Sequence, residues 1–301
     1  MNEEAKGMLA AAAAYSIFGL SYLFSKLALN VTEPAILLCA RFTLTLIILN
    51  ILVLSRFVKI DLKKKKKHLW QAVLLGFLQP VGYFILENYG LKYTTTSFTG
   101  MISSVTPVFT AILGVLLLHE RPAAKQWLFI VLSIIGVAMI SLQTANGGAN
   151  TPAGCICLVA AYFLGSFYTL LVRRLSKEYT PFELTYVMFT VGFVFFVFYA
   201  FAQFGGNTPA VLADACSHGQ FLIAVVYLGG LSSVGAYLLV NYSLARLPVA
   251  RATIFNTFST VVGVLAGVVI LHDPFTWYSL AAFVLMLGSV LGYNLSANKA
   301  E

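Results

Sequence analysis

The amino-acid sequence predicts an all-α membrane protein whose ten transmembrane helices form a 5+5 inverted repeat, with N-terminus and C-terminus cytoplasmic. Three observations lead to this prediction: ten long apolar stretches, a segment repeated in the two halves, and a biased placement of lysine and arginine. Of the 301 residues, 59% are hydrophobic and only 10% are charged. The chain therefore lacks the polar surface that a soluble protein of this length requires.

The apolar stretches set the expected number of helices. Most of them approach the roughly 20 residues that cross a bilayer core, and the short links between them leave little material for a soluble domain. Their apolar residues are continuous rather than alternating, which favours helices over the strands of a membrane barrel. The expected helices lie near residues 7–29, 34–54, 69–91, 96–118, 126–143, 153–172, 182–203, 219–243, 248–271 and 275–296.

The two halves of the chain contain related sequence. Residues 76–120 align without a gap on residues 229–273 after a shift of 153 positions, and thirteen positions are identical. The identities include a repeated Leu-His-acid tripeptide, which pairs His119 with His272. Each half holds five expected helices, and because five is odd, the second half enters the membrane from the opposite face. Inverted repeats of this kind are typical of alternating-access transporters.

A polar and turn-rich stretch near residues 143–152 separates the two copies. It is uncharged, as an external linker can be. Pro34 and Pro181 open the second helix of each half, which fits the same division. We therefore assign residues 1–147 to the first five-helix repeat and residues 148–301 to the second, inverted repeat.

Lysine and arginine gather on one side of the predicted topology. That side holds both termini and the links after the second, fourth, sixth and eighth helices, including the run Lys63–Lys67. The other side has Lys92, together with Lys26 near a helix end. The positive-inside rule therefore places both termini in the cytoplasm. Because the lysine run lies between two spans, we interpret it as a topology anchor on anionic lipid rather than a nucleic-acid site.

Three charged residues fall inside the outer half of the expected membrane helices. A charge in this position costs several kcal/mol unless it is paired or hydrated. Lys26, Arg41 and Glu87 belong to the first three helices, so one expectation is a charge cluster with a role in coupling. The alternative is structural: an ion pair, or side chains that extend to the lipid headgroups.

Pro80 and Pro107 lie well inside the third and fourth expected helices. Each removes a backbone donor and clashes with the carbonyl one turn earlier, so we expect a kink at both. The freed carbonyl needs a nearby partner in a bilayer, and Ser103 and Ser104 are candidates for the kink at Pro107. The kinks serve either as static bends for packing or as hinges.

Aromatic, hydroxyl and amide side chains recur along six expected helices from both halves. A single aromatic residue in a membrane helix usually packs or anchors the interface, but facing polar stripes predict a shared cavity. Such a lining suits a small organic solute better than a metal ion, which would need more carboxylates. The expected cavity residues are Tyr15, Phe18, Tyr22, Gln79, Tyr83, Asn88, Ser104, Tyr162, Ser166, Ser233, Tyr237, Asn241 and Asn256.

The sequence shows no motif for catalysis or cofactor binding. It contains no Gly-x-Ser-x-Gly, no His-Glu-x-x-His and no phosphate-binding loop. The four cysteines give neither a disulfide framework nor a metal-binding spacing. We therefore expect no enzyme activity, no cofactor and no metal. A membrane-embedded enzyme would need a convergent catalytic set, and a receptor or scaffold would give no reason for inverted repeats.

Several segments resemble those of one known family in their order and spacing. The segments are Phe18–Lys26, Pro34–Phe42, Asn88–Thr96, Ser103–Thr110 and Leu116–Arg121. Together they resemble the EamA-type branch of the drug/metabolite transporter superfamily, and the resemblance covers essentially the whole chain in two copies.

The resemblance implies ten helices in a five-plus-five inverted repeat around a central cavity. The first, third, fourth, sixth, eighth and ninth helices would wall this cavity, with the fifth and tenth to one side. It also implies export of amino acids and other small metabolites across the bacterial cytoplasmic membrane without ATP hydrolysis. Two positions depart from the family pattern: Phe18 stands where tryptophan is frequent, and Thr260 where proline is frequent. We therefore expect the second half to bend less than the first.

The sequence thus predicts a secondary transporter that exports a small polar or amphipathic metabolite by alternating access of two inverted repeats. Amino acids are the leading class, and a drug, nucleoside or sugar-derivative carrier is the alternative within transport. The expected partners are the solute and the lipid bilayer, and the protein is a monomer or a homodimer. Two Gly-x-x-x-Gly pairs, at Gly263 and Gly288, serve either packing within the chain or a dimer contact.

Overall fold

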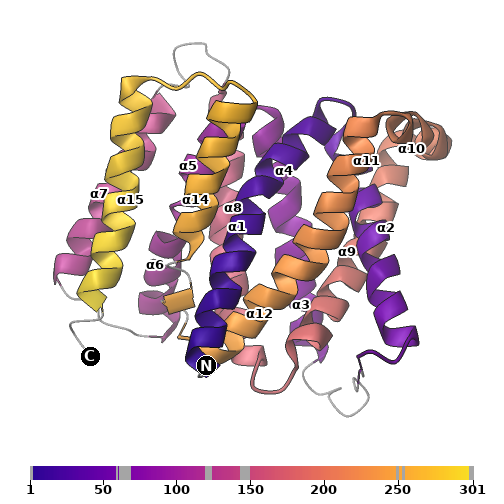
Figure 1. Cartoon of the computed structure of the whole chain (residues 1–301), viewed down its shortest axis with the longest axis horizontal. Coiled ribbons are helices and arrows are strands. Elements are labelled where there is room, and N and C mark those ends of the chain that lie inside the picture. The colour runs from indigo at the N-terminus through magenta and orange to yellow at the C-terminus, as the bar shows by residue number, and fades with distance from the viewer. Residues whose placement is uncertain are drawn as a thin grey trace.

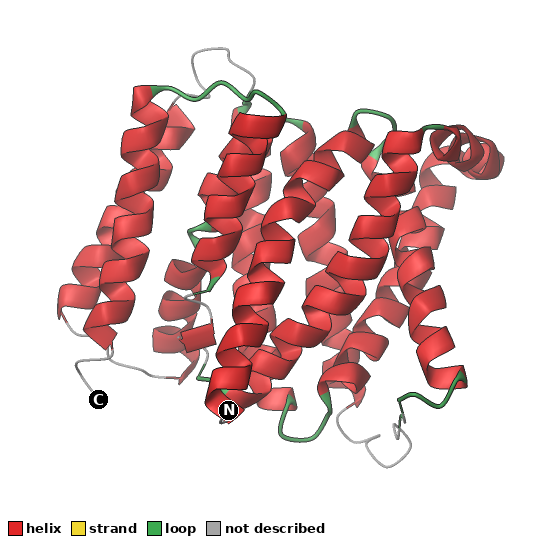
Figure 2. Cartoon of the chain, viewed as in Figure 1, coloured by secondary structure: helices red, strands yellow, loops and turns green. Residues whose placement is uncertain are grey.

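The computed structural model describes residues 3–58, 60, 69–118, 124–142, 150–248, 251–252 and 255–297. Every regular element within these ranges is helical (Figure 2), which confirms the predicted all-α class. Three features of the sequence analysis lie wholly or largely outside the described residues: the lysine run Lys63–Lys67, His119, and the linker between the repeats.

The first half contains five apolar helical segments, two of which are interrupted. The continuous helices are α1 (Glu3–Leu29), α2 (Pro34–Leu54) and α7 (Ala124–Leu142). The third segment consists of α3 (Leu69–Gly76), the π-helical η2 (Phe77–Gly82) and α4 (Tyr83–Lys92). The fourth consists of α5 (Thr96–Ser103) and α6 (Thr106–Leu118). The interruptions fall at the two expected kinks.

The second half repeats this order with one addition. Its continuous helices are α8 (Pro152–Leu175), α9 (Pro181–Phe204) and α15 (Trp277–Ala297). The eighth segment consists of α11 (Gly219–Val226), η5 (Tyr227–Ala236) and α12 (Tyr237–Arg246), and the ninth contains α14 (Asn256–Leu265) and η6 (Ala266–Ile270). The addition is η4 (Gly205–Asn207) and α10 (Thr208–Ser217), which lie at one corner of the molecule (Figure 1).

Capping residues set the starts of several helices. Pro34, Pro152 and Pro181 open α2, α8 and α9, where the missing N–H would have no helical acceptor. Thr180 and Glu183 form a capping box at the start of α9: the backbone N–H of Glu183 donates to Thr180 Oγ1 at 3.2 Å, and that of Thr180 donates to Glu183 Oε2 at 2.8 Å. Local sequence therefore fixes where these helices begin.

Seven helical stretches are long and apolar enough to cross a membrane. They are Glu3–Leu29, Pro34–Leu54, Leu69–Lys92, Thr96–Leu117, Pro152–Leu175, Pro181–Ser217 and Gly219–Arg246. Three shorter apolar helices, Trp127–Met139, Asn256–Ile270 and Trp277–Tyr293, accompany them. Apart from α10 at the end of Pro181–Ser217, these helices run between the same two edges of the molecule (Figure 1). The helical multi-pass architecture is confirmed, and the count of ten spans stays a prediction.

The first helices of the two halves run in opposite directions. Glu3, the first residue of α1, forms an ion pair with Arg246, the last residue of α12. α1 therefore begins at the edge of the molecule where α12 ends, which we call the N-terminal edge. α1 ends at the opposite edge, where Lys26 donates to the Thr94 carbonyl at 2.6 Å. α8 begins there as well, since the Thr151 N–H donates to the Tyr93 carbonyl at 3.0 Å. α1 and α8 are therefore antiparallel (Figure 1), as inverted repeats require.

Helices α7 and α15 pair at one side of the molecule (Figure 1). Gly136 of α7 faces the Met286 side chain, and Gly292 of α15 faces the Phe129 ring. Small residues let membrane helices approach closely, so these glycines fit contacts within the chain. The arrangement matches the peripheral fifth and tenth helices that the family resemblance implies.

Helix α14 packs closely against α5 and α1 of the other half. A Cβ atom built on Gly100 would lie 2.9 Å from the Val264 nitrogen, and one built on Gly263 would lie 2.7 Å from the Tyr22 ring. Such distances leave no room for a side chain at either glycine. The Gly263 face therefore packs within the chain rather than being free for a dimer contact.

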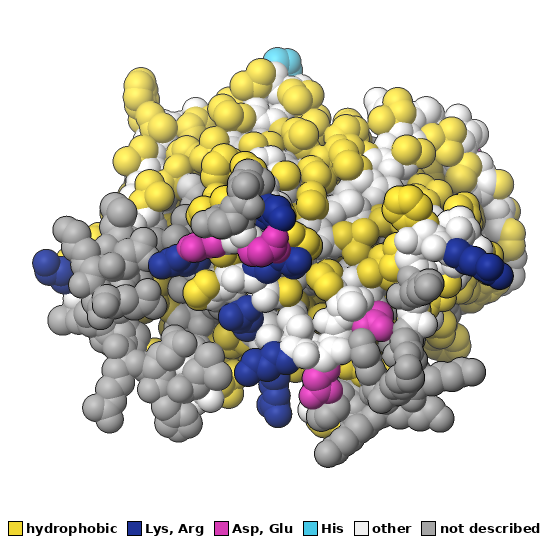
Figure 3. Space-filling model, turned by 60° about the horizontal axis from the view of Figure 1, so that its bottom comes forward, with side chains coloured by type: hydrophobic (Ala, Val, Ile, Leu, Met, Phe, Trp, Pro, Cys, Tyr) yellow, Lys and Arg dark blue, Asp and Glu magenta, His cyan; other side chains and the backbone are white. Residues whose placement is uncertain are grey.

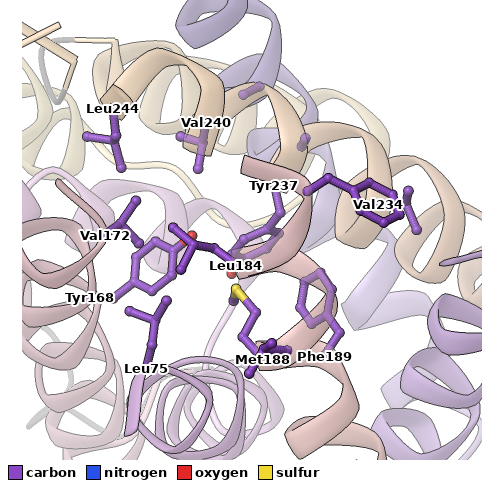
Figure 4. Close-up of a cluster of buried hydrophobic side chains, with 14 of the residues drawn as sticks. Leu75, Tyr168, Val172, Leu184, Met188, Phe189, Val234, Tyr237, Val240 and Leu244 are labelled. Carbon is purple, nitrogen blue, oxygen red and sulfur yellow. The ribbon is translucent and has the colours of Figure 1, made fainter. Parts of the chain in front are cut away.

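A cluster of buried apolar side chains also joins the halves. Figure 4 shows Leu75 of α3 in the same cluster as Tyr168 of α8, Met188 of α9 and Tyr237 of α12. Because lipid tails are as apolar as these side chains, helix association in a membrane depends on close van der Waals packing. This cluster supplies such packing around the aromatic residues that line the cavity described below.

Positive charge is concentrated at the N-terminal edge. Figure 3 turns this edge towards the reader and shows lysine and arginine side chains across it. Among the described residues, the helix ends at this edge carry Lys6, Arg56, Lys125, Arg173, Arg174, Lys177, Arg246 and Arg251, and those at the opposite edge carry Lys26 and Lys92. Lys92 is also paired with Glu33 at 2.5 Å. This asymmetry agrees with a cytoplasmic N-terminal edge.

Candidate functional site

A cavity lies between the two halves, walled by side chains from α1, α2, η2, α4, α6, α8, η5, α12 and α14. Its volume is about 70 Å³. Since a water in a cavity needs about 10–15 Å³, the cavity accepts a few waters and must widen for a metabolite. Its walls include Tyr15, Phe18, Tyr22, Gln79, Tyr83, Tyr162, Tyr237 and Asn256, all predicted from the sequence.

Tyrosine rings form much of the cavity wall, and most of their hydroxyls are already engaged. The hydroxyls of Tyr22, Tyr83, Tyr162, Tyr168 and Tyr237 each take part in a hydrogen bond. Tyr15 is different: its ring packs edge-to-face on Phe18 at 6.0 Å, and its hydroxyl forms no hydrogen bond with any described residue. This hydroxyl is available to a solute.

Arg41 places a guanidinium group in the cavity wall. The residue is 1% exposed, and its Nε and Nη2 donate to Ser233 Oγ at 2.9 Å and Ser232 Oγ at 3.3 Å. The guanidinium carbon lies 4.1 Å from the centre of the Phe84 ring, a cation–π contact. Nη1 forms no hydrogen bond within the described part of the chain, which leaves one nitrogen for an anionic group.

Glu87 contributes a carboxylate to the same cavity. It is 5% exposed, and the Tyr83 hydroxyl donates to its Oε1 at 2.6 Å. Among the described residues, Oε2 accepts no hydrogen bond. The cavity therefore holds one cationic and one anionic side chain, each with unused hydrogen-bonding capacity.

The predicted charge cluster of Lys26, Arg41 and Glu87 forms only in part. Arg41 and Glu87 line the same cavity, although none of the ion pairs in the described ranges joins them. Lys26 is not part of this lining and donates to the carbonyls of Leu91 at 2.8 Å and Thr94 at 2.6 Å. Two serines of η5 and backbone carbonyls at the end of α4 and in the turn after it satisfy the cations instead. A role of these charges in coupling stays a prediction.

Comparison with known proteins identifies the family. The sequence model of the EamA-like transporter family matches residues 5–142 and again residues 152–295. The chain belongs to this family. The two matches cover most of the chain and correspond to the two halves related by the sequence repeat. Because the family consists of transporters, the protein is a transporter and not an enzyme, as predicted.

Relatives from bacteria and archaea match over much of their length. The chain is 33% identical over 292 residues to the uncharacterized transporter YcxC of Bacillus subtilis, covering 96% of this chain and 93% of YcxC. It is 24% identical over 272 residues to an uncharacterized transporter of Archaeoglobus fulgidus, covering 90% and 92% of the two chains. A probable terminal-alkyne amino-acid exporter of Streptantibioticus cattleyicolor is 26% identical over 191 residues, covering 64% of this chain and 61% of the exporter.

A solved crystal structure shares the fold. It matches with a TM-score of 0.65 over 99% of both chains at 19% sequence identity. The family match and the seven apolar helices make the transporter a multi-pass membrane protein, in bacteria a protein of the cell membrane.

Two amides predicted to line the cavity of the transporter lie behind its wall. Asn241 is fully buried, where its Oδ1 accepts from the Tyr168 hydroxyl at 2.6 Å and its Nδ2 donates to Thr185 Oγ1 at 2.9 Å. Asn88, the equivalent residue in the first half, donates from Nδ2 to the Phe84 carbonyl at 2.8 Å. Neither amide is part of the cavity lining; Asn241 joins α12 to α8 and α9, whereas Asn88 bonds only within its own helix.

Three serines predicted for the cavity also lie outside its lining. Ser104 donates to the Met101 carbonyl at 2.7 Å, and Ser166 donates to the Tyr162 carbonyl at 2.9 Å. The hydroxyl oxygen of Ser233 accepts a hydrogen bond from Nε of Arg41. Hydroxyls in membrane helices commonly bond the preceding turn in this way, so a polar residue on a helix is weak evidence for a solute contact.

Several lining residues were not predicted from the sequence. They are Ser21, Phe84, Thr106, Gly165, Thr169, Ser232, Val240 and Leu244. Tyr168 and Ser259, which belong to the polar stripes of their helices, also line the cavity, and Arg41 lines it from a helix that was not expected to wall it. Gly165 and Thr169 follow Tyr162 by three and seven residues, so they share its face of α8 and the spacing could have indicated them. The apolar Val240 and Leu244 carried no signal, because nothing distinguishes them from ordinary packing residues.

Both predicted proline kinks are breaks in the helix. At Pro80 the preceding residue Gln79 leaves helical geometry, with φ −148° and ψ 116°, and its amide donates to the Tyr237 hydroxyl. The Pro80 ring lies against Gly192 of α9, where an added Cβ would come within 2.5 Å of it. At Pro107, α5 ends at Ser103 and α6 begins at Thr106. Whether these breaks act as hinges stays a prediction.

Proposed function

We propose that the transporter exports a small amphipathic metabolite with a carboxylate and an ammonium group, amino acids being the leading class. One observation carries this proposal: a cavity between antiparallel halves presents Arg41 and Glu87 together, each with an unused hydrogen-bonding group. A guanidinium is well suited to a carboxylate, and a buried carboxylate needs a cationic or hydrogen-bonding partner. A zwitterion satisfies both.

The remaining lining suits the rest of such a solute. Phe18 and Tyr237 lie 5.0 Å apart in edge-to-face contact, and Tyr15 presents a hydroxyl to the cavity. Aromatic faces hold apolar groups and cations, so we expect a solute whose side chain is largely apolar. The relative from Streptantibioticus, named a probable amino-acid exporter, supports the same solute class.

The two halves contact each other at both edges of the molecule. At the opposite edge, the Ser97 N–H at the start of α5 donates to Asp273 Oδ2 of the second half at 2.7 Å. At the N-terminal edge, Glu3 pairs with Arg246 at 2.8 Å and Glu4 pairs with Arg251. In alternating access one set of contacts opens while the other holds. We propose ten spans with the N-terminal edge in the cytoplasm, since most of the described positive charge lies there.

Flux measurements in proteoliposomes test the proposal. Purified protein is reconstituted, and counterflow of labelled amino acids, nucleosides and sugars is measured in wild type and in Arg41→Gln, Glu87→Gln and Tyr15→Phe. We expect amino-acid flux, with the apparent affinity falling roughly 10- to 100-fold in the two charge variants, because a hydrogen bond to a charged group contributes about 1.5–3 kcal/mol. Tyr15→Phe should lower the affinity less.

Tyr199→Phe is the matched control. Its hydroxyl bonds the Tyr89 hydroxyl at 2.9 Å outside the cavity, so its flux should equal that of wild type. Flux of nucleosides or sugars without amino acids would replace the proposed solute class with the alternative. Unchanged amino-acid affinity in both charge variants would show that the solute binds elsewhere.

A further inference from the structure

The break at Pro107 leaves a buried backbone carbonyl without its helical donor. Proline has no N–H, so the carbonyl four residues earlier, that of Ser103, receives no hydrogen bond from the backbone of residue 107. Ser103 is fully buried, and an unpaired carbonyl in this environment is costly. Some other group must therefore donate to it.

Two side chains take the place of the missing donor. Thr106 Oγ1 donates to the Ser103 carbonyl at 2.8 Å, and Asn256 Nδ2 donates to it at 2.8 Å. From the sequence, Ser103 and Ser104 themselves were candidate partners. Their hydroxyls instead donate to the carbonyls of Gly100 at 2.6 Å and Met101 at 2.7 Å, which are in the turn before.

The two donors differ in origin. Thr106 belongs to the same helix, whereas Asn256 is the first residue of α14 in the other half of the molecule. The repeat shift of 153 positions takes Ser103 onto Asn256, so equivalent positions of the two copies meet here. A second bond, between Ser103 Oγ and Thr260 Oγ1 at 3.1 Å, lies in the same seam between α5 and α14.

We propose that Asn256 is a positioning residue for the break in the fourth membrane helix, supplying from the opposite repeat the hydrogen bond that Pro107 cannot. The seam lies in the wall of the cavity, because Thr106 and Asn256 both line it. When the repeats move against each other, this bond must lengthen or exchange its partner. Asn256 thereby couples the bend of one half to the position of the other. Only this coupling rests on the proposed transport cycle; the bond itself does not.

Pro107→Ala provides a direct test, because alanine restores the backbone N–H. Thermal unfolding midpoints are measured in detergent for wild type, Asn256→Leu, Pro107→Ala and the double variant. We expect Asn256→Leu to lower the midpoint by roughly 2–6 °C in the wild-type background and by much less in the Pro107→Ala background. Equal losses in the two backgrounds would overturn the proposal.

Asn241 provides the matched control. It is also a buried amide of the second half, but its bonds go to Tyr168 and Thr185, so Asn241→Leu should cost the same with and without Pro107→Ala. If Pro107→Ala does not fold, a second double-mutant comparison replaces the first: Thr106→Val, Asn256→Leu and the variant that carries both. Losing both donors should cost more than the sum of the single losses, and simple additivity would contradict the shared carbonyl.

Transport kinetics separate positioning from solute contact. Asn256→Leu should lower the maximal flux with little change in the half-saturating concentration, and Pro107→Ala should partly rescue it. A raised half-saturating concentration without rescue would assign Asn256 to the solute and overturn the positioning role. If no solute is carried at all, the proposed function fails, and the unfolding cycle still decides whether Asn256 serves the break.

Discussion

The contact between α5 and α14 gives the sharpest test of how the two halves are held together. At Gly100 an added Cβ would lie 2.9 Å from the Val264 nitrogen and 3.1 Å from the Gly263 carbonyl carbon. These are backbone atoms, so they cannot rotate away as a flexible side chain would. Non-bonded carbon contacts are normally about 3.5–4.0 Å, and Gly100→Ala therefore requires the two helices to separate.

The size of the effect follows from two opposing contributions. Overpacking a well-packed contact costs about 1–3 kcal/mol, and alanine in place of glycine within a helix stabilises by about 0.5–1 kcal/mol. Gly288 of α15 has no neighbouring atom within 4 Å of an added Cβ, so only the second contribution applies to Gly288→Ala. The difference between the two variants isolates the overpacking, about 1–3 kcal/mol.

The assay is thermal unfolding of both variants in the same detergent. Gly288→Ala should be as stable as wild type or slightly more stable. The unfolding midpoint of Gly100→Ala should lie roughly 2–10 °C below that of Gly288→Ala. Flux should also fall in Gly100→Ala, because the separation lengthens the polar contacts of the α5–α14 seam. Equal midpoints for the two variants would refute the close backbone contact and the reasoning built on it.

Three further predictions concern other regions. Because Arg41 and Glu87 are opposite charges in the same cavity, the double variant Arg41→Met with Glu87→Gln should lose less stability than the sum of the two single losses, by about 0.5 kcal/mol or more; fully additive losses would show that the two charges do not interact. In intact cells an impermeant maleimide should label the exposed native Cys216 but not Lys177→Cys in a Cys216→Ser background, and the reverse would invert the topology. Gly192→Ala should cost about 1–3 kcal/mol in unfolding free energy, because its Cβ would meet the rigid ring of a proline at 2.5 Å; an unchanged midpoint would contradict that packing.

Membrane class, helix positions and the inverted repeat were predictable from sequence because each depends on a local or periodic property. The length of an apolar stretch determines whether a helix crosses the bilayer, and an odd number of helices per copy inverts the second copy. The proline breaks were predictable for the same reason: Pro80 and Pro107 lack the donor that a continuous helix needs. The tyrosines Tyr15, Tyr83 and Tyr237 line the cavity as expected.

Which residues the buried charged and amide side chains bond to depended on tertiary structure. Membrane depth suggested that Lys26 and Arg41 would meet Glu87, but depth does not determine the rotation of a helix about its axis. That rotation is set by close contacts such as those at Gly100 and Gly192, which involve residues far apart in the sequence. For the same reason, the sequence did not reveal that Asn88 and Asn241, which occupy equivalent positions in the two repeats, lie outside the cavity lining.

The sequence by itself determined that this protein is a helical membrane transporter built from two inverted copies, since composition, periodicity and repetition are properties of the chain. Only the tertiary structure showed that Arg41 is held by serines of η5 and that Asn256 donates to the carbonyl freed by Pro107. A buried polar group bonds to whichever donor or acceptor packing brings within about 3 Å. Packing between two inverted copies brings together residues that no spacing along the chain relates.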